Sequence, residues 1–341
     1  AILPPTHEGL TFQEWNWTLS DIASYNRRYI DIGANYITTD GKTYIKGYVS
    51  SVAEDVIMSF NGQYGTLEID WGDESTPDTN TFTSAVDYSY THTYSATGNY
   101  TVKCTFTQIS NNGKFGPTQH NQLNRWSRNF FIEVFNCGSC FTIEKTNAFS
   151  SITNRFILSI PTSAYISVYQ GFNNSFPEIV TIPRNVSVLS SYNGFTRIMG
   201  KISLPKVVPD VAAASFQRFC GTRLVVPECS DNTQTYNKYG FSECSYMGVL
   251  SIPLGFDIGQ NTIFSTSNFY YLDIVQGWVP NASFRLDYCS SFGIEGCVDF
   301  FNKLGTTNDT ITITLSGVLL NTLTSSQKAI ATDKGYTLAS L

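Results

Sequence analysis

A short phrase of alternating apolar residues, closed by proline, returns at a nearly fixed interval through the second half of the chain. The first copy is Leu158-Ser159-Ile160-Pro161, and the later copies begin at Val180, Ile202, Leu224 and Leu250. The closing residues are Pro161, Pro183, Pro205, Pro227 and Pro253, so the steps are 22, 22, 22 and 26 residues. Further steps of 22 reach Leu272-Asp273-Ile274-Val275 and then Ile294-Glu295-Gly296-Cys297, without the proline. A fixed period in the twenties is typical of a solenoid.

The phrase predicts a short strand in each repeat. Its first and third residues fall on one face of a strand, and proline ends the strand because it has no N–H for a ladder. One such strand cannot bury its apolar face alone, but stacked copies form a continuous core. An aromatic residue precedes five of the phrases, and we expect it to pack on the returning arm of each coil; these residues are Phe172, Phe195, Phe216, Phe241 and Phe264.

A different pattern, without a long period, fills the region before the repeats. Segments 29–32 and 44–49 alternate apolar and polar residues and predict strands, with Asp40-Gly41 as the turn between them. Segment 56–60 predicts another strand ending in an Asn61-Gly62 turn, and 129–135 predicts a closing strand. We therefore interpret residues 21–136 as one all-β domain.

The two ends of the chain have their own patterns. Residues 1–20, with Trp15 and Trp17, are interpreted as an N-terminal arm. Residues 301–341 are interpreted as a small α/β unit that caps a solenoid spanning 149–300. Around its start we expect a short helix over 298–304. A strand over 310–315 follows, then a capping box from Thr324 to Gln327 that opens a second helix, and a last strand after Gly335.

The first domain contains a specific motif: Asp70-Trp71-Gly72-Asp73, followed after a loop by His92-x-Tyr94-x-x-x-Gly98-x-Tyr100-x-Val102. This pattern closely resembles the PKD family over roughly residues 45–135. The resemblance implies an immunoglobulin-like β-sandwich. Glu74 stands where the family has a second glycine, which puts the turn after Asp73 in question.

The motif residues are expected to be structural. Gly72 lets the chain turn and Asp73 caps that turn through its side chain. His92 is expected to make a structural hydrogen bond. Asp70 and Asp73 could hold calcium, but two carboxylates are few for an ion that takes six to eight oxygens, so we predict no metal and no cofactor.

The repeats resemble a second family, the BspA-like leucine-rich repeats, in which an aromatic-led arm precedes an Ile-x-Ile-Pro strand. The segment from Leu323 to Leu338 is similar to the ends of BspA-like surface proteins and of bacteriophage tail or fibre proteins. The resemblance implies adhesion and recognition without catalysis.

The composition narrows the class of protein. The 341 residues carry 14% charged side chains and a net charge of −6, with 20 Tyr and 24 Phe. Low charge with many neutral polar groups indicates an extracellular or virion β protein. The absence of a basic run argues against nucleic acid, and no apolar run is long enough for insertion into a membrane.

Candidate chemistry is sparse. The eight cysteines include Cys137-x-x-Cys140, which has the spacing of a redox or zinc pair, but no second pair completes a zinc site and we favour a packing role. The three histidines are His7, His92 and His120, and neither His7 nor His120 stands in a catalytic pattern. We therefore expect the protein not to be an enzyme.

Tyrosines in and near the repeats are the candidate binding residues, because tyrosine is both apolar and hydrogen-bonding. More than half of them are expected to fill the core. The candidates for an exposed face that contacts sugars or a partner protein are Tyr192, Tyr236, Tyr239, Tyr246, Tyr270 and Tyr271.

These patterns favour a non-enzymatic structural and recognition protein at the surface of a bacteriophage virion, as a head decoration, head fibre or tail-associated protein. The expected partners are other virion proteins and a host-surface glycan or protein. The sequence leaves open whether the protein forms a homo-oligomer. The alternatives are a secreted bacterial cell-surface adhesin and a non-catalytic carbohydrate-binding module.

Overall fold

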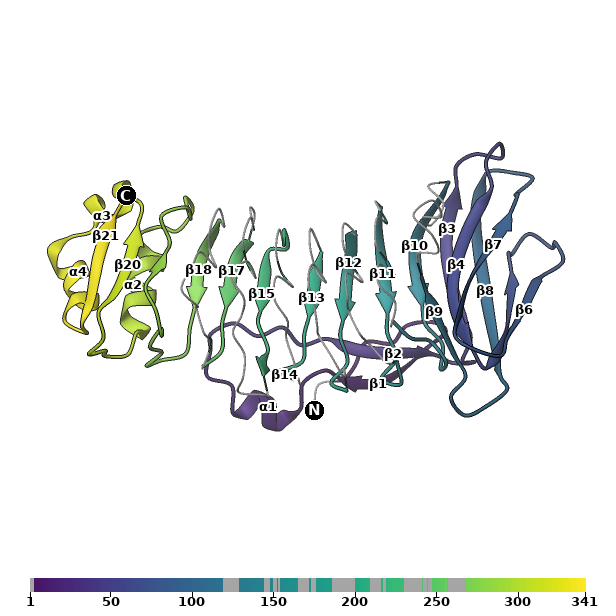
Figure 1. The fold of residues 1–341 in the computed structure, drawn as a ribbon, viewed down its shortest axis with the longest axis horizontal. Coiled ribbons are helices and arrows are strands. Elements are labelled where there is room, and N and C mark those ends of the chain that lie inside the picture. Colours follow the sequence, from purple (N-terminus) through teal and green to yellow (C-terminus); the bar gives the residue numbers. More distant parts are fainter. Residues whose placement is uncertain are drawn as a thin grey trace. The chain divides into compact units, whose positions relative to one another are not determined.

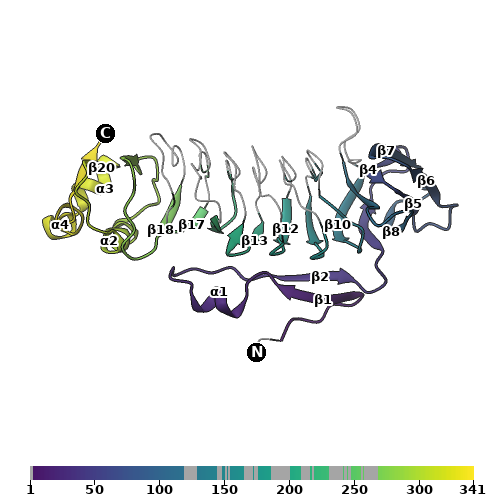
Figure 2. The same ribbon diagram turned by 60° about the horizontal axis from the view of Figure 1, so that its bottom comes forward.

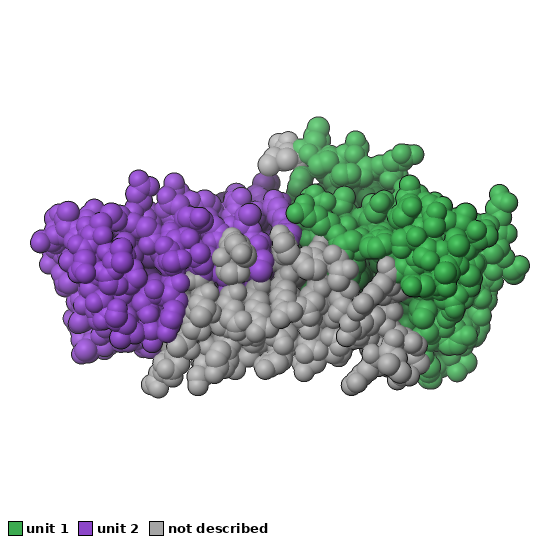
Figure 3. Space-filling view, turned by 90° about the horizontal axis from the view of Figure 1, so that it is seen from above, with its two compact units in different colours: residues 1–16, 33–188 green, residues 17–32, 189–341 purple. Residues whose placement is uncertain are grey.

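The structure is a computed structural model. It describes residues 3–118, 129–143, 148–149, 152, 154–164, 172, 176–185, 200–208, 216, 219–229, 241, 244, 247–254, 256 and 268–341. The described residues are mainly β, with 43% strand and 11% helix in several sheets (Figure 1). The chain divides into two compact units, which Figure 3 colours separately. Unit 1 comprises residues 1–16 and 33–188, and unit 2 comprises residues 17–32 and 189–341.

Unit 1 contains a large sheet in which the hydrogen-bonding pattern changes at one strand. The strand order is β12 (Phe176–Thr181), β11 (Arg155–Ser159), β10 (Phe130–Asn136), β3 (Thr43–Val49), β8 (Gly98–Gln108), β5 (Gly65–Asp70) and β6 (Asp78–Phe82). The strand β10 pairs antiparallel with β3 and parallel with β11, so it joins an antiparallel region to the first proline-ended strands. The expected closing strand over 129–135 is confirmed by β10.

Two smaller sheets complete unit 1. The strand β4 (Val56–Gln63) lies between β7 (Val86–His92) and β9 (Lys114–Pro117), and β1 (Leu10–Trp15) pairs with β2 (Ala34–Thr38). Strand β3 buries alternate residues, as its sequence predicts. Its Ile45 and Val49 belong to a core shared with side chains of the other strands, namely Met58, Phe60, Leu67, Ile69, Val102 and Cys104.

Unit 2 also has parallel strands, one in each repeat. They are β13 (Lys201–Ser203), β15 (Arg223–Val225), β17 (Met247–Ser251) and β18 (Phe269–Asp273), with short strands β14 (Val207–Val208) and β16 (Glu228–Cys229) forming a separate pair. The strands β15, β17 and β18 pair in parallel. All five phrase-ending prolines of the chain are buried. Each preceding strand ends two residues before its proline, which confirms the prediction that the proline ends the strand.

The repeated aromatic residues stack on one another inside each unit. Phe149 and Phe172 of unit 1 lie with ring centroids 5.3 Å apart, and Phe216 and Phe241 of unit 2 lie 5.6 Å apart. All four rings are fully buried. Because successive copies place a ring at the same position, the rings form a core that continues from one repeat to the next. Phe195 and Phe264 lie outside the described residues.

The end of unit 2 is built from α2 (Ile294–Lys303), α3 (Gly317–Thr322), α4 (Ser325–Thr332) and a parallel sheet of β19 (Phe284–Arg285), β20 (Ile311–Leu315) and β21 (Tyr336–Ser340). The predicted capping box is confirmed, since Thr324 and Gln327 exchange hydrogen bonds at the start of α4. The extension of the phrase to Ile294 is wrong. That residue begins α2, whose inward side buries Cys297, Phe300 and Phe301.

Two local predictions in the first 70 residues are also wrong. Segment 29–32 is not a strand, and the strand before the Asp40-Gly41 turn is instead β2. The chain does not turn at Asn61-Gly62, because β4 continues to Gln63 and turns at Tyr64. Gly62 serves packing instead: a Cβ there would lie 2.5 Å from the Phe82 ring.

Within unit 2, residues 17–32 cross the C-terminal ends of the parallel strands. Figure 2 shows this stretch, with α1 (Leu19–Ala23), running along the row of strands at their ends. Trp17 donates to the Leu204 carbonyl at 2.8 Å, and the Ser203 hydroxyl donates to the Asp31 carbonyl at 2.7 Å. Further along, the Arg27 guanidinium donates to the carbonyls of Val226 and Ser251, both at 3.0 Å. The segment is therefore attached to one strand end after another.

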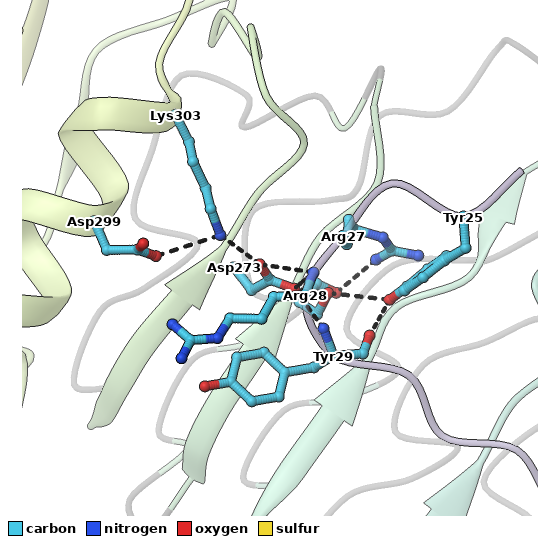
Figure 4. Close-up of polar contacts among 8 residues, drawn as sticks. Tyr25, Arg27, Arg28, Tyr29, Asp273, Asp299 and Lys303 are labelled. Carbon is cyan, nitrogen blue, oxygen red and sulfur yellow. Dashed lines mark hydrogen bonds and ion pairs between the residues drawn. The ribbon is translucent and has the colours of Figure 1, made fainter. Parts of the chain in front are cut away.

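A buried carboxylate, Asp273, is the last of these attachment points (Figure 4). It is 1% exposed and accepts the backbone N–H groups of Arg28 and Tyr29 at 3.0 and 3.2 Å. The Ser251 hydroxyl donates to it at 2.9 Å, and the Lys303 ammonium pairs with it at 2.8 Å. Every oxygen of this carboxylate therefore has a donor, as a buried charge requires.

This network predicts a large stability loss for Asp273→Ala. The change leaves the N–H groups of Arg28 and Tyr29 and the Lys303 ammonium without their buried acceptor, and we expect about 3–5 kcal/mol less free energy of unfolding. Urea unfolding of the full chain, followed by circular dichroism, measures it.

Asp299→Ala is the matched control. Asp299 pairs with the same ammonium at 3.3 Å but is 35% exposed on α2. Its loss should change the free energy of unfolding by less than about 0.5 kcal/mol. Equal losses in the two variants would contradict the proposed role of Asp273.

Candidate functional site

The Asp70–Asp73 motif forms a compact polar cluster in unit 1. Gly72 has a φ of +77°, as the turn requires, and Asp73 accepts hydrogen bonds from the backbone and hydroxyl of Ser75. His92 lies 2.7 Å from the same carboxylate. Its ring stacks on buried Trp71 with centroids 4.8 Å apart. The structural hydrogen bond expected for His92 is therefore present.

Residues from the second half of the motif also pack on this cluster. The Tyr94 hydroxyl donates to the Trp71 carbonyl at 2.9 Å, and Tyr94 packs on Tyr100 with ring centroids 4.1 Å apart. Gly98 has a φ of +154° at the start of β8. The turn after Asp73 keeps a left-handed residue at Glu74, with a φ of +65°, in the place where the PKD family has glycine.

Both carboxylates of the motif are already paired. The Lys103 ammonium lies 2.7 Å from Asp70, and its hydrogen bond holds the pKa of that carboxyl below its usual value. Burial alone would raise the pKa of Asp73, but hydrogen bonds from Ser75 and His92 outweigh it and lower that pKa. Among the described residues, no group of three or more His, Cys, Asp or Glu side chains is arranged to hold a metal ion. The charged groups of the cluster are therefore paired with one another, and the cluster has a structural role.

The candidate tyrosines are only partly within the described residues. Tyr192, Tyr236, Tyr239 and Tyr246 lie outside them. Tyr270 and Tyr271 are neighbours on β18, where Tyr270 is 58% exposed and Tyr271 is half-buried. Tyr270 is thus an outward-pointing aromatic residue of the kind that the sequence predicts.

The outward positions of the parallel strands are in register within each unit. In unit 1, Val134 of β10 pairs with Ile157 of β11, and Ile157 pairs with Ile179 of β12; the two isoleucines are 44% and 48% exposed. In unit 2, Arg223, Val249 and Tyr271 occupy the equivalent row. Each unit therefore presents a strip of side chains with one member from each strand.

The cysteines that the structure describes are not in disulfides. Cys104 and Cys137 are fully buried, and burial raises the pKa of both thiols. Burial likewise raises the pKa of Cys297 to about 12. Cys140 differs, because it is half-buried at the edge of a groove. A packing role therefore fits Cys104, Cys137 and Cys297, whose thiols are protonated at neutral pH.

This groove is open and polar and lies in unit 1, with a volume of about 460 Å³. One wall is the turn after β4 with Gln63 and Tyr64, and another is the loop between β8 and β9. The floor contains Phe141 and Thr142, both buried. The remaining lining residues are Gln108, Asn111, Asn112, Gly113, Lys114, Ser139, Cys140 and Ser163.

A second cleft in unit 1, of about 350 Å³, is more apolar. It lies where His7 and Tyr36 face Ile157 and Ile179. The His7 ring meets Tyr36 edge-on at 4.9 Å, so this histidine packs on an aromatic ring. His120 lies outside the described residues.

The groove does not follow from the amino-acid sequence alone. The sequence predicts a loop over 111–117, but the structure places the strand β9 at Lys114–Pro117, and the turn predicted at 61–62 lies at Tyr64. The dense run of amide side chains at Gln108, Asn111 and Asn112 was the available signal, but nothing local links it to Gln63 or Ser139.

Comparisons with protein-family models, with curated proteins and with solved structures find no match to this chain. In the described part of the chain, no helix is long and apolar enough to cross a membrane.

The motif turn predicts a selective stability loss for Gly72→Ala. A Cβ at Gly72 would lie 2.5 Å from the Thr101 carbonyl oxygen, in addition to the strain of a φ of +77°. We expect about 2–4 kcal/mol lower free energy of unfolding. Gly9→Ala is the control, since Gly9 has a φ of +73° but open space around its Cβ position, and it should cost only about 1 kcal/mol. A loss at Gly72 no larger than that at Gly9 would rule out the steric contribution.

The lowered pKa values of Asp70 and Asp73 predict a loss of stability in acid. A carboxyl whose pKa is depressed on folding contributes stability above its unfolded pKa of about 4, and that contribution disappears as the pH falls through the folded pKa. Thermal unfolding of the full chain between about pH 6 and pH 2 should show it. Asp73→Asn should lower the melting temperature at pH 6 and flatten the acid dependence, whereas parallel curves would contradict the assignment.

Proposed function

We propose that this chain is a non-enzymatic structural and recognition protein of a bacteriophage virion. Its N-terminal region docks on capsid or tail proteins, and its repeats present a surface to host or neighbouring molecules. Binding is by non-covalent surface complementarity, so many weak contacts add up when several copies are displayed.

The observation that carries this proposal is the in-register strip of outward side chains. Parallel strands place Ile157 beside Ile179 in unit 1 and Val249 beside Tyr271 in unit 2. In such a strip the exposed side chains repeat at the spacing of the strands, which suits an extended partner surface. Tyr270, 58% exposed on β18, adds an aromatic contact of the type enriched at protein interfaces.

The proposal also includes a finer description of the fold. The antiparallel strands β3, β8, β5 and β6, facing β4, β7 and β9, fit a PKD-type β-sandwich, since they bury one shared core. The parallel strands with stacked Phe149–Phe172 and Phe216–Phe241 fit a BspA-like solenoid. The polar α/β end fits a cap for it.

A secreted bacterial adhesin with the same modules is the second candidate, supported by the same strip. A carbohydrate-binding module is the third. The polar groove at Tyr64 favours it, because amide and hydroxyl side chains line an open site there.

Mass spectrometry of gradient-purified virions and of the cell envelope from the source culture tests the proposal. We expect peptides of this chain in the particles, in constant proportion to the capsid proteins. Peptides confined to an envelope fraction that lacks capsid proteins would overturn the virion assignment and leave the bacterial adhesin.

A further inference from the structure

We propose that the groove at Tyr64 binds a neutral saccharide. This inference rests on the recognition role proposed above and deepens it by naming the chemical class of one ligand. It also places that ligand on unit 1.

The hydrogen-bonding groups of the groove match those of a sugar. Four amide side chains line it: Gln63, Gln108, Asn111 and Asn112. An amide offers both donors and acceptors, and so can serve a hydroxyl in either role. The amide nitrogens of Gln63 and Gln108 already donate to the carbonyls of Asn112 and Gly113, at 3.5 and 2.6 Å, so each of these two side chains uses one donor within the groove wall. Asn111 and Asn112 are exposed, so their polar atoms are accessible from solvent. Ser139, Thr142 and Ser163 add hydroxyl groups.

The charge of the groove favours a neutral ligand. Its lining, as far as the structure describes it, contains no Asp or Glu, and Lys114 is its one ionised side chain. Lys114 already takes part in another interaction. A multiply charged ligand would therefore find few counter-charges, whereas a neutral polyol needs none.

Tyr64 supplies the apolar contact that a sugar ring needs. The C–H groups on one face of a pyranose carry a slight positive charge and are attracted to the negative face of an aromatic ring. Tyr64 is 42% exposed at the tip of the β4–β5 turn and is one of the residues that line the groove. The 109–113 loop fixes its position, because the Ile109 N–H donates to the Tyr64 carbonyl at 2.9 Å.

The backbone at Tyr64 indicates that the ring serves a purpose other than folding. Its φ is +50°, a left-handed conformation that costs a bulky residue about 1–2 kcal/mol. Glycine or asparagine would occupy this turn more easily. The loop opposite is adapted to the same turn, since a Cβ at Gly113 would lie 2.5 Å from the Tyr64 carbonyl oxygen. Tyr64 therefore keeps a strained backbone at a position that lines the groove, and we infer from this strain that its side chain serves the groove.

The experiment is a glycan array probed with the full chain, followed by affinity electrophoresis in gels that contain the neutral polysaccharide giving the strongest array signal. Tyr64→Asn removes the ring and suits the left-handed turn. We expect it to weaken binding by about tenfold or more while its melting temperature stays at or above that of the wild type. Asn111→Ala with Asn112→Ala should weaken binding without moving the backbone.

Tyr88→Ala is the matched control. Tyr88 is 43% exposed on β7 of the same unit and does not line the groove, so binding should be unchanged. Loss of binding in the Tyr88 variant, or binding that survives Tyr64→Asn, would place the sugar elsewhere and overturn the proposal.

Cys140 provides a second readout at the groove itself. Cys140 and Cys220 are both half-buried thiols outside disulfides, and Cys220 belongs to unit 2. The saccharide should slow iodoacetamide labelling of Cys140 and leave that of Cys220 unchanged. Equal rates with and without saccharide would contradict binding in this groove.

These outcomes are separate from those of the virion experiment. An array without any neutral-glycan signal, or with signals from acidic glycans alone, overturns the ligand assignment. It leaves the recognition role standing if the peptides are found in particles. Binding to a neutral glycan by a chain found only in the envelope would retain the site and overturn the virion assignment.

Discussion

Five short parallel strands end just before a proline, and the polar groups at that end must find partners away from the ladder. A buried carbonyl or hydroxyl without a partner is costly, and these ends recur with every repeat. In unit 1 the Asn35 side chain donates to the carbonyls of Ile160 and Thr181, both at 3.1 Å. In unit 2 the Arg27 side chain does the same for Val226 and Ser251. An N-terminal segment thus satisfies the strand ends of both units.

This constraint explains the middle position of the phrase, which the sequence pattern alone leaves open to any residue. The residues found there are Ser159, Thr181, Ser203, Val225, Ser251 and Asp273. The hydroxyls of Ser159 and Ser203 donate to backbone carbonyls of the N-terminal segment, and Asp273 accepts its N–H groups. Val225 is the apolar exception. There Arg27 reaches the following carbonyl, that of Val226, so a side chain of the segment replaces a side chain of the repeat.

Polar clusters in this protein fall into two kinds, and the difference bears on function. The Asp273 network and the Asp70–Asp73 corner use their charges internally, on Lys303, Lys103 and His92. Such clusters stabilise the fold and leave nothing for a ligand. The groove at Tyr64 is different because it is open and is lined by amide side chains, of which Asn111 and Asn112 are exposed. Recognition is therefore best sought at the groove and along the outward strips, where side chains point to solvent.

The amino-acid sequence by itself determined the features that depend on neighbouring residues. The alternation in β3, the capping box at Thr324 and the prolines that end the strands follow from local geometry and could be predicted. Only the tertiary structure decided the features that depend on distant partners. Segment 29–32 alternates like a strand, but the buried Asp273 takes up its neighbouring N–H groups, and Asn61-Gly62 continues a strand because Phe82 packs on Gly62. The groove belongs to this second class, because its walls lie up to a hundred residues apart, from Gln63 to Ser163, and no local pattern records that they meet.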